Sequence, residues 1–96
     1  MDKPAKPEVG TCVAVIHERY DSSGERTSFE RWHGVVESVN AEGYLLTLGG
    51  VRHGQDYLIP ISGELRPLPG GHFHFEESDE WVAPLFMYKT ETRQRS

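Results

Sequence analysis

The sequence contains very little cysteine and no long apolar run, and these absences narrow the class of protein. Cys12 is the single cysteine among 96 residues, so no internal disulfide bond can form and nothing indicates an oxidising compartment. No apolar run approaches the roughly 18 residues of a membrane-spanning helix. The polar, proline-containing start lacks the apolar stretch of a signal peptide. We therefore expect a cytoplasmic protein with no membrane partner.

Catalytic motifs are also missing from the sequence. It has no GxSxG nucleophile elbow, no complete glycine-rich phosphate loop, no HExxH and no CxxC. A chain of this length has little room for the deep pocket that small-molecule chemistry requires. We expect a protein that is not an enzyme and that needs no cofactor.

Positive charge is scarce as well. The chain has 10 Lys and Arg against 15 Asp and Glu, which gives a net charge of −5. Nucleic-acid binding depends on clustered Lys and Arg, so this balance makes nucleic acid the less favoured partner. Arg19, Arg26 and Arg31 flank the first expected hairpin, and a nucleic-acid-binding alternative depends on their convergence.

What the sequence does contain is a series of short alternating segments separated by turn residues. β-Branched and aromatic residues bounded by Gly, Pro, Asn and Asp predict strands at 11–20, 27–40, 44–48, 55–61, 72–76 and 85–90. Ser78 is a plausible N-cap followed by acidic residues, which predicts one short helical turn near 78–83. The expected organisation is a disordered lead at 1–9, one β-barrel domain at 10–90 and a flexible tail at 91–96.

Alternation within these strands predicts which side chains face the core. In the first strand the inward set is Cys12, Ala14 and Ile16, and in the third it is Tyr44, Leu46 and Leu48. Gly34, in the middle of the long second strand, suggests a bulge or sharp bend. Pro60 marks an edge strand, and 85–90 is a second candidate edge for pairing with a partner or another copy.

A fold-level resemblance rests on several of these residues. They are Gly10, Val13, Ala14, Trp32, Gly34, Val35, Val36, Tyr44, Leu46, Leu48 and the segment 57–60. The pattern resembles a small SH3-like antiparallel barrel of five or six strands, closest to the Tudor type. The resemblance implies a module that binds peptides, proteins or nucleic acids. A Tudor-type aromatic cage would use Trp32, Tyr44 and Tyr57, which fit core packing equally well.

An acidic run followed by tryptophan is a candidate contact surface. The run is Glu76, Glu77, Asp79 and Glu80, with Trp81 directly after it. One interpretation is a docking patch for a basic partner with Trp81 as its aromatic anchor. The other is a solvated turn with Trp81 packed inward. The loop around His53 is a further candidate for contacts.

Two histidines at strand spacing form a candidate metal site. His72 and His74 would lie on one strand face about 6.5–7 Å apart at Cα, close enough to chelate one ion. The competing interpretation places Phe73 and Phe75 in the core and leaves both imidazoles in water, because a metal site needs three or four convergent ligands.

These observations favour a small, non-enzymatic binding module that docks a protein or peptide partner through its loops and its acidic patch. Nucleic-acid binding and metal binding are the alternatives, and homodimerisation is a further hypothesis.

Overall fold

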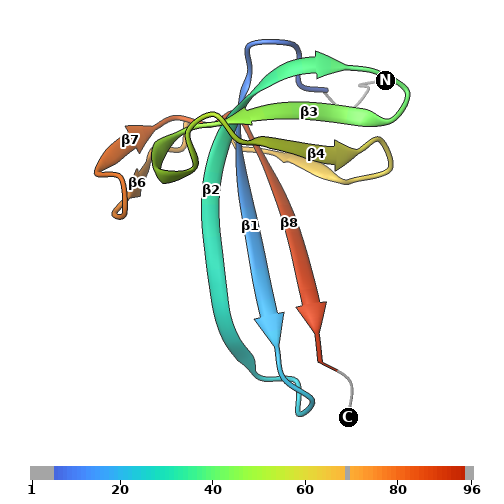
Figure 1. The fold of residues 1–96 in the computed structure, drawn as a ribbon, viewed down its shortest axis with the longest axis vertical. Coiled ribbons are helices and arrows are strands. Elements are labelled where there is room, and N and C mark those ends of the chain that lie inside the picture. Colours follow the sequence, from blue (N-terminus) through green and yellow to red (C-terminus); the bar gives the residue numbers. More distant parts are fainter. Residues whose placement is uncertain (1–5, 69, 95–96) are drawn as a thin grey trace.

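The structure is a computed structural model that describes residues 6–68 and 70–94 (Figure 1). Within these ranges the chain is all-β, as the alternation predicts. The strands are β1 (Cys12–Tyr20), β2 (Arg26–Val39), β3 (Gly43–Leu48), β4 (Asp56–Pro60), β5 (Leu65–Pro67), β6 (Phe73–Phe75), β7 (Glu80–Val82) and β8 (Phe86–Arg93). One 3₁₀ turn, η1 (Gly50–Arg52), lies between β3 and β4.

Six of the strands form one sheet in the order β4-β3-β2-β1-β8-β5, and β6 pairs with β7 as a separate hairpin. Among the described residues β4 and β5 do not pair with each other, so hydrogen bonds do not close the sheet into the expected barrel. The expectation of antiparallel pairing throughout is also wrong at one place, since β1 and β8 run parallel.

The core lies where β1, β2, β3, β4 and β8 meet. Val13, Val15, Leu46 and Ile59 have no exposed surface, and burial of each such side chain contributes about 1.5–3 kcal/mol. The inward positions predicted for β3 are confirmed. Of those predicted for β1, Ala14 is buried as expected, whereas Cys12 and Ile16 are not fully buried.

The uninterrupted apolar run on β1 explains this difference. Cys12 and Ile16 are only half-buried, whereas Val13 and Val15 are fully buried and Ala14 is nearly so. Both faces of β1 are therefore covered over this stretch. Burial raises the pKa of the Cys12 thiol, which suits a packing role.

Gly34 has a packing role, and the bulge lies further along β2. The register with β3 shifts between Val36 and Ser38. A Cβ on Gly34 would lie 2.9 Å from the Leu48 side chain and 2.9 Å from the backbone oxygen of Thr47. The backbone oxygen cannot rotate away, so glycine allows β3 to pack closely against β2 at this point.

The helical turn expected near 78–83 is wrong. Asp79 has φ of +52°, which ends any right-handed helical turn, and the chain then forms β7. Trp81 pairs with His74 across the hairpin. Cross-strand pairing of β6 with β7 therefore overrides the local capping signal of Ser78.

Parts of both terminal segments are described. Residues 1–5, 69, 95 and 96 lie outside the described residues. Of the expected lead, Pro7 is buried and Glu8 O accepts from the Thr11 amide at 3.0 Å. At the other end β8 continues past Thr90 to Arg93, and the Gln94 amide donates to Tyr20 O at 2.9 Å.

Three strands extend beyond the rest of the molecule. Residues 16–20 of β1, 26–32 of β2 and 89–93 of β8 run side by side as a long arm (Figure 1). Because β3 pairs with β2 only from Gly34 onward, and β5 pairs with β8 only up to Tyr88, the arm has a sheet edge on each side.

Candidate functional site

The first part of β2 is an open strand edge. β2 has 14 residues and β3 only 6, so within the described residues no strand pairs with 26–33 on the side away from β1. An unpaired edge presents backbone donors and acceptors that an added strand can bind.

The neighbouring hydrogen bonds show which backbone groups face outward. Val36 N donates to Thr11 O on the β1 side at 2.9 Å, whereas His33 O accepts from Gly49 N on the opposite side at 3.0 Å. Hydrogen-bonding direction alternates along an antiparallel strand. Phe29 and Arg31 therefore direct their backbone N–H and C=O groups away from β1.

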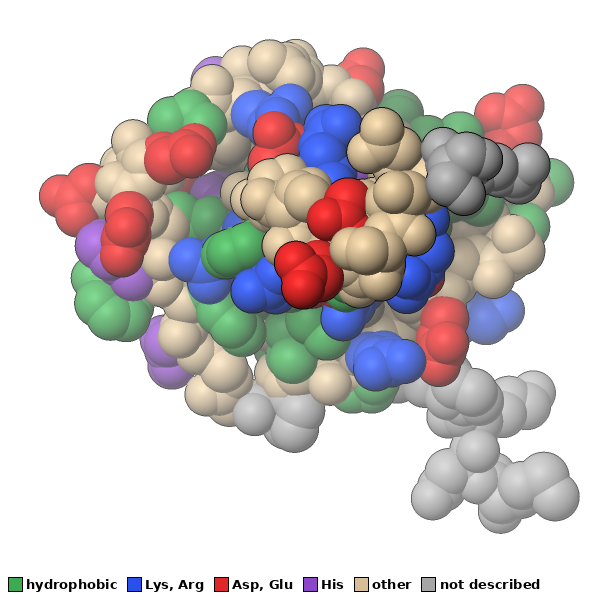
Figure 2. All heavy atoms as spheres, turned by 90° about the horizontal axis from the view of Figure 1, so that it is seen from below, with side chains coloured by type: hydrophobic (Ala, Val, Ile, Leu, Met, Phe, Trp, Pro, Cys, Tyr) green, Lys and Arg blue, Asp and Glu red, His purple; other side chains and the backbone are tan. Residues whose placement is uncertain are grey.

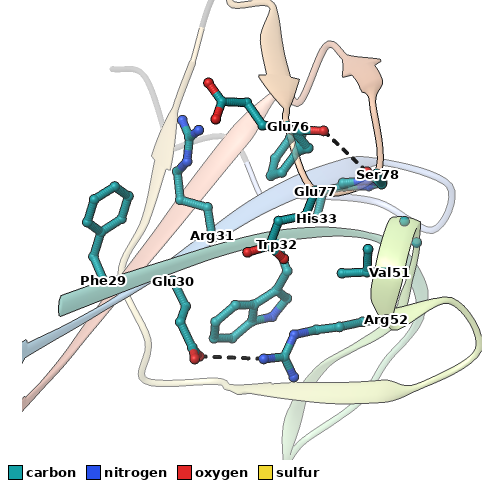
Figure 3. Close-up of a pocket in the computed structure, with 13 residues that line it drawn as sticks. Phe29, Glu30, Arg31, Trp32, His33, Val51, Arg52, Glu76, Glu77 and Ser78 are labelled. Carbon is teal, nitrogen blue, oxygen red and sulfur yellow. Dashed lines mark hydrogen bonds and ion pairs between the residues drawn. The ribbon is translucent and has the colours of Figure 1, made fainter.

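A pocket of about 240 Å³ lies along this edge (Figure 3). Its floor is the segment 29–33 of β2. One wall is the segment 75–78 of the β6–β7 hairpin, and the other is the segment 49–52 around η1. Gly50 has φ of +64°, and a Cβ there would lie 3.0 Å from the Ser78 hydroxyl, so the two walls approach closely behind the pocket.

One ion pair and two arginine–ring contacts line the pocket. The Arg52 guanidinium lies 4.8 Å from the centre of the Trp32 ring and 3.5 Å from a Glu30 carboxylate oxygen. On the hairpin side, the Arg31 guanidinium lies 5.7 Å from the centre of the Phe75 ring. The pocket thus offers apolar ring surfaces beside charged groups, which suits recognition of a peptide more than of a purely apolar ligand.

The acidic residues fall into two groups on the hairpin. Glu80 hydrogen-bonds His33 of β2 at 3.0 Å, which links the hairpin to the main sheet, and Asp79 hydrogen-bonds His74 at 2.9 Å within the hairpin. Glu76 and Glu77 line the pocket and form no ion pair with another described residue. Of the predicted acidic patch, they are the carboxylates available to a ligand.

Trp81 is exposed, and the interpretation that packs it inward is wrong. Its side chain is 71% exposed and its ring stacks on His74 with 4.9 Å between ring centres. Trp81 therefore lies on the hairpin as a free aromatic surface, as the docking interpretation requires. His53 is exposed at the end of η1, and we find no side-chain polar contact between it and another described residue.

The predicted metal pair is not brought together as a site. His74 is engaged with Asp79 and Trp81, and His72 is exposed before β6 begins. In the part of the chain that the structure describes, no group of three or more His, Cys, Asp or Glu side chains is placed to hold a metal ion.

The three arginines of the nucleic-acid alternative lie on two faces. In the register of β1 and β2, Arg31 is opposite Ile16 and Arg26 is opposite Tyr20, which places both on one face of the arm. Arg19 is one residue removed from Tyr20 and faces the other way. The convergence of all three on one face, on which the nucleic-acid alternative depends, is therefore not present.

The aromatic cage has no support from the packing. Tyr44 is buried in the core, and Trp32 packs edge-on against Tyr57 with ring centres 5.6 Å apart. The chain's own Arg52 already covers the Trp32 ring. These contacts leave no ring of free aromatic faces around a ligand cation.

The sequence reasoning missed the open edge and the pocket beside it. Pro60 lies on an edge strand as predicted, because β4 ends the sheet. The second predicted edge, 85–90, is not an edge over 86–88, where β8 lies between β1 and β5. The one available signal for the β2 edge was length, since the second expected strand far exceeds the third and must extend beyond it. Phe29, Arg52 and Phe75 carried no signal of a shared pocket.

Comparisons with known proteins give no match to a family model, to a curated protein or to a solved structure. Among the described residues, no helix is long and apolar enough to cross a membrane.

Proposed function

We propose that this chain is a non-enzymatic binding module that takes an extended peptide segment of a protein partner as an added strand on β2. The observation that carries the proposal is the open edge at 26–32 with a pocket directly alongside it. Backbone hydrogen bonds to the outward groups of Phe29 and Arg31 would give affinity, and alternate side chains of the peptide would enter the pocket.

The charges of the pocket favour a basic peptide. Arg31 and Arg52 are each placed over an aromatic ring, and Arg52 also contacts Glu30, whereas neither Glu76 nor Glu77 forms an ion pair with a cation of the described residues. A Lys or Arg of the partner would supply that cation. Trp81 pairs with His74 on the opposite face of the hairpin from the pocket-lining Phe75. Trp81, Asp79, Glu80 and His53 would therefore contact the partner outside the pocket, with Trp81 as an aromatic anchor.

The test begins with a displayed library of random ten-residue peptides selected on the wild-type protein. Selected peptides are then titrated by calorimetry against wild type, Arg31→Pro and Glu76→Gln/Glu77→Gln. We expect enrichment of Lys and Arg and at least a tenfold loss of affinity in Arg31→Pro, because proline removes an outward N–H and its ring blocks the edge.

A matched control is available on the other side of the sheet. Leu58 lies on the edge strand β4, two residues before Pro60, so Leu58→Pro places a second proline on an edge outside the proposed site. Leu58→Pro should bind the selected peptides as wild type does. Equal loss in both proline variants, or a library that yields no enriched sequence, would refute strand addition at β2.

The proposal includes three further expectations, about the fold class, the oligomeric state and the location of the protein. The SH3-like, Tudor-type likeness concerns the arrangement of β1 to β4, around which the remaining strands would be additions. Pairing of two β2 edges would give a homodimer, which light scattering of the purified protein tests. A cytoplasmic location would follow from a cytoplasmic partner.

A further inference from the structure

A second surface with different chemistry lies on the flat face of the arm. Three rows of side chains cross the face from β2 through β1 to β8. The first row is Arg31, Ile16 and Lys89, the second is Phe29, Glu18 and Glu91, and the third is Arg26, Tyr20 and Arg93. Four cations thus occupy the corners of the face, from segments that are scattered in the sequence.

The carboxylates of this face are already engaged. Glu18, only 5% exposed, contacts Arg26 at 3.0 Å and Lys89 at 2.8 Å from opposite sides. These two cations, Lys89 first, lower the pKa of Glu18 to about 2. Glu91 forms an exposed ion pair with Arg93 at 3.3 Å. Four cations against two carboxylates leave the face with an excess of positive charge, although the whole chain is acidic.

Two aromatic rings lie among the cations, and each has a guanidinium over one of its faces. Phe29 is 49% exposed, and the Arg26 guanidinium lies 4.9 Å from its ring centre. Tyr20 has the Arg93 guanidinium 4.4 Å from its ring centre. Aromatic rings and guanidinium planes are the surfaces on which unpaired bases stack. Figure 2 looks at the end of the arm and shows Lys and Arg side chains gathered around it.

We propose that this face binds single-stranded nucleic acid, with the corner cations contacting phosphates and Phe29 and Tyr20 stacking bases. The carboxylate-rich body of the protein would repel a duplex running across it, whereas a short single strand can follow the arm alone. The excess charge predicts contact with about two to three phosphates and weak, salt-dependent binding.

The test is fluorescence anisotropy with labelled twelve-nucleotide oligothymidylate and oligouridylate. For single strands, two to three contacts predict that affinity falls roughly 7- to 18-fold between 50 and 200 mM salt. Arg93→Gln should weaken binding and reduce the salt dependence, because it removes one cation that contacts a phosphate. Arg93 is exposed at the end of β8, so its loss leaves the core intact. Phe29→Leu should weaken binding roughly fivefold or more through lost stacking.

Arg19→Gln is the matched control, because Arg19 carries the same charge on the opposite face of the same arm. It should bind both oligonucleotides as wild type does. The proposal is overturned if wild type binds neither oligonucleotide at 50 mM salt, or if Arg19→Gln weakens binding as much as Arg93→Gln. It is also overturned if a twelve-residue polyglutamate binds as tightly, since the face then takes an acidic peptide.

Different variants test the two proposals, so the failure of one can be distinguished from the failure of the other. Arg93 is absent from the pocket lining, so Arg93→Gln should leave binding of the library-selected peptides unchanged. Glu76→Gln/Glu77→Gln removes charge only from the hairpin and should not weaken oligonucleotide binding. Circular dichroism of each variant verifies that the strands are retained.

Discussion

Comparing the stabilities of two variants with proline at neighbouring positions of β2 tests whether the edge of this strand is open. Arg31 directs its N–H away from β1, whereas Glu30 pairs with His17 and directs its N–H toward β1. Arg31→Pro should therefore remove no ladder hydrogen bond. Glu30→Pro should remove one and leave an acceptor on β1 without its donor.

The difference between the two variants can be estimated. Leaving a partly buried acceptor unpaired costs about 1–3 kcal/mol, and the effect of proline on the unfolded chain is similar at both positions and cancels. At about 4–8 °C per kcal/mol for a domain of this size, Glu30→Pro should melt roughly 4–24 °C below Arg31→Pro. The contact of Glu30 with Arg52 at 3.5 Å is exposed and contributes at most about 1 kcal/mol.

Thermal unfolding followed by circular dichroism provides the measurement. Arg31→Ala and Glu30→Ala serve as controls that subtract the side-chain contribution at each position. If both prolines lowered the melting temperature equally after this subtraction, an element would have to cover the β2 edge. The strand-addition site would then be untenable.

Three further predictions concern the core and the two ion pairs of Glu18. Leu46→Ala should cost about 2–5 kcal/mol in urea unfolding, whereas Leu58→Ala, exposed on the edge strand, should cost well under half of that. Gly34→Ala should destabilise the protein by about 1–3 kcal/mol, since the added methyl meets a backbone oxygen; an unchanged urea midpoint would contradict the close packing of β3 on β2. Glu18 has a folded-state pKa of about 2 against an ordinary 4.5, so its stabilising contribution is present above about pH 4.5 and is lost as the pH falls toward 2. Glu18→Gln should accordingly have a lower urea midpoint than wild type at pH 6, and the difference should shrink at pH 3.

The strands are predictable from the sequence because alternation and turn residues are local properties. Tyr44, Leu46 and Leu48 alternate with less buried neighbours, and their inward direction follows from that alone. Val13 to Ile16 are apolar at every position, so alternation does not predict which of these side chains face the core. The burial of Val13 and Val15 depends on which strands cover each face of β1. Partner choice is not local either, and nothing in the 86–93 segment specifies a parallel partner in β1.

The candidate site was predictable only in part. The acidic residues and Trp81 were identified, because charge and aromatic content are read directly from the sequence. The exposure of Trp81 depends on the turn at Asp79, which replaces a helical turn by a hairpin. The pocket and the basic face both arise from the register of strands far apart in the chain, and register is a property of the whole sheet.

The parallel pairing of β1 with β8 makes closure of the main sheet a non-local step of folding. His17 and Thr90, which touch across this pairing, are 73 positions apart. A loop of this length has to close before the contacts between the two strands can stabilise it, which slows folding and leaves one side of β1 uncovered until β8 has paired. We therefore expect the β1–β8 pair to form late, and variants that weaken β8 to expose apolar strands even though much of β8 itself is exposed.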